Sequence, residues 1–465
     1  MPQPAIKHSS GRAVRSERAK REYLQFNNRS ERNRDILARL ERGLVIEQDL
    51  SLGPLVRPSD ADEPIQRWFR YREGYTAELC RRIIQPDDTY VVDPFCGFGS
   101  TLVAAARLGV ESLGFDVSPL AAFVSTVKTR AYSDSLRVKL RRHTRRLARL
   151  TSTAKTASAP TIRILPKLFH PDILHGLLVF RSAIDAVRNK EEREFLLFAW
   201  IAILERVSNV YREGNGIKYR NRLRRGNIYS VTPYDEWQAN RFPADKFRFV
   251  RDTLLSQLQT MLDEATLLQA GPEPLVFQRD ASSIAAQKRR ASLVLFSPPY
   301  CNCFNYIKAY KLELWMAGFI RAYPDIRGLT TMGLRSRVES LLNPVIETYP
   351  SVVEELIALM DPTGLWSAQL PDLIRGYFAD MQVALSSIFN GLKKHGRCVI
   401  IVGNSAYGSV LVPSDLLLTH IASSAGFQVE KVVITRHLTT SSQQKRCLEP
   451  VKEFLRESII HLRKN

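Results

Sequence analysis

Residues 89–116 have the pattern of a strand, a glycine-rich turn, a helix and a second strand in immediate succession, and few folds accommodate such a run. The β-branched segment TYVVDPF, residues 89–95, predicts a short strand. STLVAAARLG, residues 100–109, predicts an alanine-rich helix that ends at Gly109, and ESLGFD, residues 111–116, predicts the next strand. A strand–helix–strand unit places its two strands in parallel. We therefore expect an α/β fold built on a mostly parallel sheet.

The turn between the first strand and the helix is DPFCGFGS, residues 93–100, and its glycines allow a ligand to approach the backbone closely. A phosphate-binding P-loop requires Lys where this chain has Ser100. A dinucleotide-binding turn requires a small residue in place of Leu102, which would crowd the helix against the strand. The remaining class is the nucleoside methyltransferases. In that class Asp93 would suit the ammonium of a methionine group, and Asp116 would accept hydrogen bonds from both ribose hydroxyls.

A second segment with chemical character follows the apolar strand ASLVLF, residues 291–296, which stops at SPPY, residues 297–300. Prolines cannot continue a central strand, so the chain must leave at the carboxyl edge of the sheet, where α/β proteins bind ligands. The proline carbonyls and the Ser297 hydroxyl can accept the hydrogens of an exocyclic amine and stabilise the positive charge that develops during transfer. Tyr300 would offer an aromatic face to a base turned out of its helix. Further candidates for lining the base pocket are Asn302, Asn305, Tyr306 and Lys308.

DPFCGFGST and SPPY together resemble motifs I and IV of the amino-methyltransferases of DNA, which make N4-methylcytosine or N6-methyladenine. The resemblance covers residues 61–130 and 271–465. It implies a Rossmann-like, seven-stranded, mostly parallel sheet whose last strand is antiparallel. It also implies S-adenosylmethionine as cofactor, a flipped base as substrate, and direct methyl transfer without a covalent intermediate.

The resemblance also assigns roles residue by residue. Asp280, just before the catalytic strand, matches the acid that the family places near the cofactor adenine. RWFRYREGYTAELCRRII, residues 67–84, resembles the helix that packs over the methionine end, and it contains Tyr71 and Tyr75 as further candidates. The full set of expected cofactor-binding residues is Asp93, Phe95, Gly97, Gly99, Asp116 and Asp280, and the expected catalytic residues are Ser297, Pro298, Pro299 and Tyr300.

Around these motifs the chain divides into four stretches. Residues 1–60 form a basic N-terminal extension that contains a helix with a free basic face, and residues 61–130 and 271–465 form the two parts of the methyltransferase core. Residues 131–270 predict a large, mainly helical insert in which residues 210–230 form an irregular loop. We expect this insert to contact DNA and to take part in target recognition. The cofactor loop precedes the catalytic loop in this chain, which is the reverse of the order in many relatives that have this motif I sequence.

Net charge favours a polyanionic partner. The chain has 67 Lys and Arg against 47 Asp and Glu, a formal charge of +20, and phosphate contacts of such a protein release counterions. The basic helix predicted at 137–149 is one candidate for phosphate contact. No apolar run approaches the roughly 20 residues of a membrane span, and no secretory signal follows the basic start, so we expect a cytoplasmic protein. The six cysteines lack zinc-ligand spacing, and the chemistry requires no metal.

Several functions remain open at this stage. Ser as the first residue of SPPY favours cytosine N4 over adenine N6, although the same acceptors serve both amines. An RNA base methyltransferase is a second possibility, and a catalytically inactive nucleic-acid-binding protein that keeps the fold is a third. If the chain is the modification half of a restriction system, a cognate restriction endonuclease is a further expected partner.

Overall fold

The computed structural model describes most of the chain. The described ranges are 28–57, 63–69, 74–213, 216–225, 228–231, 236, 241–268, 271–340, 348–439 and 448–465.

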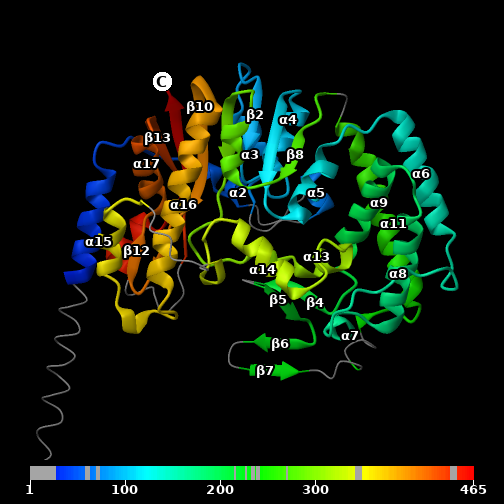
Figure 1. The fold of residues 1–465 in the computed structure, drawn as a ribbon. Coiled ribbons are helices and arrows are strands. Elements are labelled where there is room, and N and C mark those ends of the chain that lie inside the picture. Colours follow the sequence, from blue (N-terminus) through cyan, green and yellow to red (C-terminus); the bar gives the residue numbers. More distant parts are fainter. Residues whose placement is uncertain are drawn as a thin grey trace, which may run out of the picture.

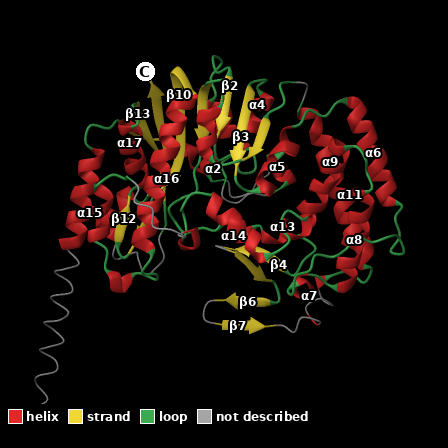
Figure 2. Ribbon diagram, in the orientation of Figure 1, coloured by secondary structure: helices red, strands yellow, loops and turns green. Residues whose placement is uncertain are grey.

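An eight-stranded sheet in the order β1-β13-β14-β10-β9-β2-β3-β8 forms the centre of the molecule (Figures 1 and 2). β14 is antiparallel to both of its neighbours, and every other neighbouring pair is parallel. The strands are β1 (Ile46–Gln48), β2 (Tyr90–Asp93), β3 (Glu111–Asp116), β8 (Leu275–Gln278), β9 (Ala291–Phe296), β10 (Leu392–Gly403), β13 (Phe427–His437) and β14 (Arg456–Lys464). This confirms the mostly parallel α/β sheet with an antiparallel last strand, but with one strand more than the seven expected.

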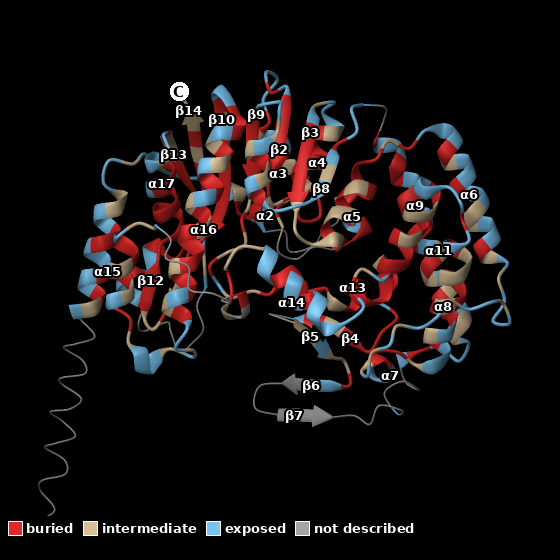
Figure 3. Cartoon of the chain, in the orientation of Figure 1, coloured by how far each residue is buried: buried red, intermediate tan, exposed pale blue. Residues whose placement is uncertain are grey.

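Helices cover both faces of the sheet, and alternate residues of each strand point to opposite faces. Leu293 and Leu295 of β9 belong to the core beneath α3 (Ala77–Ile83), α4 (Ser100–Arg107) and α5 (Pro119–Thr129). Val294 and Phe296 belong to the core beneath α16 (Leu370–Gly391) and α17 (Ser414–Ser424). Figure 3 shows the buried strands between these helical layers. The strand is apolar throughout because both of its faces are covered.

The extra strand comes from the N-terminal stretch. Residues 28–41 are helical, and β1 then pairs in parallel with β13. Three arginines of the helix form ion pairs within the molecule, Arg29 with Asp361, Arg34 with Glu453 and Arg39 with Glu355. The expectation of a free basic face is therefore wrong for these three residues. β1 thus makes part of residues 1–60 an edge of the core sheet.

The stretch expected to be helical contains α6 (Asp134–Ala148), α7 (Leu165–Leu168), α8 (Pro171–Asp185), α9 (Lys190–Ile203) and α11 (Lys246–Glu264). Its apolar residues, such as Phe195 and Trp200, share one continuous core with the α3–α5 face of the sheet. The irregular loop expected at 210–230 instead forms two hairpins, β4–β5 and β6–β7. Their strands are β4 (Val210–Glu213), β5 (Gly216–Tyr219), β6 (Arg222–Arg225) and β7 (Ile228–Val231).

Between β9 and α16 the chain crosses the carboxyl edge of the sheet as short helices (Figure 1). These are α12 (Tyr306–Ala309), α13 (Lys311–Ala317), α14 (Tyr323–Met332) and α15 (Val352–Ala358). A small hairpin, β11 (Ser405–Tyr407) with β12 (Val410–Val412), follows β10. None of the helices within the described residues combines the length and apolar character that crossing a membrane requires.

Candidate active site

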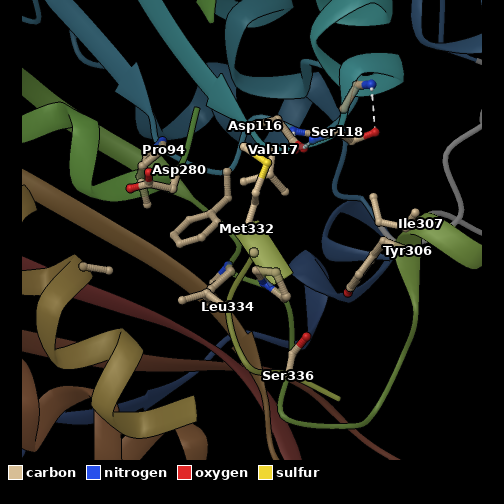
Figure 4. Close-up of a pocket in the computed structure, with 18 of the residues that line it drawn as sticks. Pro94, Asp116, Val117, Ser118, Asp280, Tyr306, Ile307, Met332, Leu334 and Ser336 are labelled. Atoms are coloured by element: carbon tan, nitrogen blue, oxygen red, sulfur yellow. Dashed lines mark hydrogen bonds between the residues drawn. The ribbon is translucent and has the colours of Figure 1, made fainter. Parts of the chain in front are cut away.

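A cavity of about 400 Å³ lies at the carboxyl ends of β2, β3 and β9 (Figure 4). Gly97 of the glycine-rich turn and Pro298 of the SPPY segment both line it, although about 200 residues of chain separate them. The two motifs therefore meet at one edge of the sheet. Of the ten residues expected at the site, seven line the cavity: Phe95, Gly97, Asp116, Asp280, Ser297, Pro298 and Pro299.

The glycine-rich turn is held tightly against α5. Gly97 and Gly99 both have positive φ, +48° and +85°, which L side chains rarely adopt. A Cβ on Gly99 would lie 3.0 Å from the Ser125 Oγ, and that hydroxyl donates a hydrogen bond to the Gly97 carbonyl at 2.7 Å. The turn therefore presents backbone, with no side chain at Gly97, to the cavity.

Leu102 does not crowd the helix against the sheet. It packs beside Gly114 of β3, where an added Cβ would come within 2.7 Å of the Leu102 Cδ1. The absence of a side chain on the neighbouring strand supplies the space that a third small residue supplies in a dinucleotide-binding turn. The expectation that Leu102 excludes a dinucleotide-binding turn on steric grounds is therefore wrong, because Gly114 on the strand opposite leaves room for its side chain.

Asp116 stands at the end of β3 with its carboxylate at the cavity. Its two oxygens accept hydrogen bonds from the backbone N–H of Gly97, at 3.0 Å, and of Ser118, at 2.8 Å. Burial raises the pKa of this carboxyl to about 6, and the two N–H donors partly oppose that effect. Each carboxylate oxygen has a further lone pair with which to accept a ligand hydroxyl.

Asp280 lies on the same side of the cavity as Asp116 and is exposed. It caps the 3-10 helix Ala281–Ala286, where its carboxylate accepts the N–H of Ser282 at 2.9 Å. Figure 4 shows Asp280 and Asp116 at the same end of the cavity.

Asp93 and Gly99 are not among the residues that line the cavity. The Asp93 carboxylate is buried behind the turn, where it accepts the N–H of Phe95 at 3.0 Å and the hydroxyl of Tyr75 at 3.1 Å. Burial raises its pKa to about 7. Tyr75, two residues before the start of α3, thus links that segment to the glycine-rich turn. Tyr71 lies outside the described residues.

Tyr300, the last residue of SPPY, is also absent from the cavity wall. Its ring packs against Gly403 of β10, where a Cβ would lie 2.9 Å from the Tyr300 Cε2. Its hydroxyl donates to the Glu457 carboxylate on β14 at 2.5 Å, and Glu457 is also paired with Arg436. Burial, followed by the Glu457 charge, raises the pKa of Tyr300 well above its ordinary value. In this structure Tyr300 attaches the SPPY loop to the sheet.

Aromatic side chains of the cavity come from the glycine-rich turn, which contributes Phe95 and Phe98, and from the chain that follows SPPY. Tyr306 and Tyr310 line it, whereas Asn302, Asn305 and Lys308 do not. Tyr306 had been considered from the sequence as one of four candidates. Ser336, Arg337 and Asp380 also line the cavity, and no sequence pattern pointed to them because they lie in segments without a recognisable motif. Within the described residues, no group of three or more His, Cys, Asp or Glu side chains has the arrangement of a metal site.

No model of a known protein family matches the chain. The type II methyltransferase M.AvaI of Nostoc sp. is 24% identical to it over 437 residues, which cover 86% of this chain and 87% of that protein, and M.AvaI of Anabaena variabilis gives the same values. The type II methyltransferase M.BsoBI of Geobacillus stearothermophilus is 22% identical over 433 residues, or 83% of each chain. Among solved structures, the rRNA methyltransferase aviRa of Streptomyces viridochromogenes aligns over 88% of this chain and 90% of its own, at 9% identity and a TM-score of 0.26. That score is too low to support an argument.

Proposed function

We propose that this chain, a distant homologue of type II methyltransferases, transfers a methyl group from S-adenosylmethionine to the exocyclic amine of a flipped base in DNA. The observation that carries the proposal is the shared cavity: the Gly97 turn, the Asp116 carboxylate and the Ser297–Pro299 acceptors line one space. The family that DPFCGFGST and SPPY resemble acts on DNA through these two motifs.

The residues of the cavity fit such a cofactor. Its volume of about 400 Å³ lies within the usual range for sites that hold ligands of this size. In our proposal the Asp116 carboxylate accepts the ribose hydroxyls, Gly97 and Phe95 contact the cofactor through the turn, and Asp280 lies near the adenine. Asp93 and Gly99 do not touch the cofactor in this proposal; they hold the glycine-rich turn in its conformation. S-adenosylmethionine, when bound, supplies an electrophilic methyl group on a positively charged sulfur.

The SPPY segment would orient the amine. The Ser297 hydroxyl and the Pro298 carbonyl accept its two hydrogens, so that the nitrogen lone pair faces the methyl group and the developing positive charge is stabilised by fixed dipoles. The hydrogen bond from the Tyr300 hydroxyl to the Glu457 carboxylate keeps the loop in place. Tyr306 and Tyr310 supply the aromatic wall beside the base. Ser297 as the first residue favours N4 of cytosine, and N6 of adenine is the alternative.

A separate hollow offers a site for the DNA backbone. It lies between the end of α9, the turn after β5 and the start of α11, and four arginines line it with two aspartates: Arg206, Arg220, Arg241, Arg248, Asp245 and Asp252. The hairpins beside it lie on the side toward which the carboxyl end of β3 points (Figure 1). We propose that phosphates bind there, so that residues 131–270 hold DNA across the cavity. The homology to type II methyltransferases also supports a partner endonuclease of the same sequence specificity.

One incubation tests the reaction and the substrate together. The protein is mixed with S-adenosylmethionine carrying a deuterated methyl group and with separate pools of unmethylated DNA and of RNA, and the products are digested to nucleosides for mass spectrometry. We expect labelled N4-methylcytosine from DNA only. Labelled N6-methyladenine would replace the base assignment, label confined to RNA would replace the substrate, and no label in either pool would leave only nucleic-acid binding.

A further inference from the structure

Ser336 carries a hydroxyl group in the cavity that has no hydrogen-bond partner among the described residues. The residue is only 1% exposed. Buried polar side chains in folded proteins almost always have a partner, and an exception needs a reason. A hydroxyl that lines a ligand cavity has an evident one, because the ligand itself can complete its hydrogen bonding.

The segment that carries Ser336 is fixed from both sides. The backbone N–H of Arg335 donates to Asp380 on α16 at 2.7 Å, and the Arg335 guanidinium donates to the same carboxylate at 2.6 Å. On the other side, the Arg337 guanidinium donates to the Thr330 carbonyl at 3.2 Å. Ser336 therefore lies between two anchored arginines. Its hydroxyl is held in position before any ligand arrives, which is the condition for an orienting contact.

Ser336 is also attached to the chain that leaves the SPPY loop. Its carbonyl accepts the N–H of Cys303, three residues beyond Tyr300, at 3.2 Å. Figure 4 shows Ser336 and Tyr306 at the end of the cavity away from Asp116 and Asp280. The end with Asp116 is the one assigned to the cofactor, so Ser336 lies at the end left for the base.

We propose that the Ser336 hydroxyl is a second polar contact for the target base and donates a hydrogen bond to an acceptor on its ring, such as N3 or O2 of cytosine. The inference rests on the proposed function. Ser297 and Pro298 hold the amine alone, which leaves the base free to rotate about that point. A contact to the ring edge from another segment would fix the base in the plane that transfer requires.

Three variants test this contact: Ser336→Ala, Ser336→Thr, and Ser414→Ala as a matched control. Ser414 is likewise buried, its hydroxyl likewise has no partner among the described residues, and it does not line the cavity. The measurements are the cofactor Kd by titration calorimetry, kcat and KM for unmethylated plasmid DNA with tritiated cofactor, and the melting temperature of each variant.

We expect Ser336→Ala to lower kcat/KM for DNA by about threefold to tenfold, the loss of one neutral hydrogen bond, with the cofactor Kd unchanged. Ser336→Thr, which keeps a hydroxyl, should recover part of the loss, and Ser414→Ala should match the wild type. Equal kcat/KM for Ser336→Ala and wild type would overturn the inference alone, as would a weakened cofactor Kd without an effect on DNA. A wild-type protein that labels no DNA would overturn the proposed function, and this inference with it.

Discussion

Asp93 and Asp116 end two neighbouring strands and have different environments. Asp116 faces the cavity, whereas Asp93 is enclosed by its own turn and the Tyr75 hydroxyl. Burial raises the pKa of both, to about 6 and about 7. Because the folded protein holds these protons more tightly than the unfolded chain, their contribution to stability is complete near pH 4. It is lost as the pH rises through the folded pKa values toward 7.

Cofactor affinity should therefore depend on pH through Asp116. Ribose hydroxyls require the carboxylate as acceptor, so we expect the Kd for S-adenosylmethionine to rise as the pH falls below about 6. Asp116→Asn should weaken binding by about tenfold or more at pH 8, the value of hydrogen bonds to a charged group, and should remove the pH dependence. Calorimetric titrations between pH 5 and pH 8 measure both effects. Asp93→Asn is the control that should keep the dependence, and if it abolishes the dependence instead, Asp93 is the titrating group.

Gly99 is required for the shape of the turn, and Gly109 provides a matched comparison. Both have positive φ, but a Cβ on Gly109 would meet nothing within 4 Å, whereas one on Gly99 would touch Ser125. We expect Gly109→Ala to cost about 1 kcal/mol, which is the backbone penalty alone. Gly99→Ala should cost about 2–4 kcal/mol because steric overlap adds to it. Urea denaturation measures the difference, and equal losses would show that the turn adjusts freely.

At the scale of elements, a buried ion-pair cluster joins the first hairpin to the cavity wall. Arg212 of β4 pairs with Glu313 of α13 and with Glu205. Its guanidinium lies 4.5 Å from the ring centroid of Tyr310 and donates to the Ala309 carbonyl at 3.2 Å. Tyr310 lines the cavity, so the position of the hairpin and the shape of the site are mechanically connected.

Replacing Arg212 alone should lower the free energy of unfolding more than replacing Arg212 and Glu313 together. Arg212→Met leaves the Glu313 carboxylate, with a side chain 1% exposed, buried without its main partner, and we expect a loss of about 3–5 kcal/mol in the free energy of unfolding. Arg212→Met combined with Glu313→Leu should recover a large part of it. Denaturant titrations of the two single variants and the double variant give the coupling energy. If the two single losses simply add, the side chains are not energetically coupled.

The hairpins also show where element-level prediction from sequence failed. Residues 210–230 contain Gly-Asn pairs between runs of Tyr, Ile and Arg, and such pairs are turn signals between short strands. The expectation of an irregular loop rested on these Gly and Asn interruptions, and the runs between them also lack a clear apolar alternation. In the structure β5 lies at the surface, with intermediate or exposed side chains. A surface strand has no buried face to impose that alternation.

At the scale of the whole molecule, two arginine-rich surfaces compete as the site of DNA contact. α6 exposes Arg141, Arg142, Arg145 and Arg146, and the exposed Arg149 follows at its C-terminal cap, on the outer side of the molecule (Figure 1). The hollow at the start of α11 lies beside the hairpins, on the side toward which the carboxyl end of β3 points (Figure 1). Because the cavity lies at that carboxyl edge of the sheet, we expect a duplex that delivers a base to it to pass the hairpins, and the hollow to carry the phosphate contacts.

The salt dependence of DNA binding distinguishes these surfaces. Each lost phosphate contact lowers the slope of log K against log salt by about 0.9. Arg241→Gln with Arg248→Gln should reduce the slope for plasmid DNA fragments and weaken binding to all sequences alike. The matched pair, Arg141→Gln with Arg145→Gln, should leave the slope unchanged. Fluorescence anisotropy at several salt concentrations measures it, and a reduced slope for the α6 pair alone would move the DNA path to the outer surface.

The sequence by itself determined the mostly parallel core of the sheet, though not its edge strand β1, and the two turns that line the cavity, with the chemistry that we propose for them. Residues 89–101 and 291–300 form local structures whose strands, glycines and prolines act within a few residues of one another. The tertiary structure alone decided that Tyr300 points to Glu457, that Tyr306 and Ser336 complete the cavity, and that Arg212 joins a hairpin to its wall. Those arrangements depend on side chains that lie more than 100 residues apart in most cases, where packing and charge pairing select partners that no local pattern encodes.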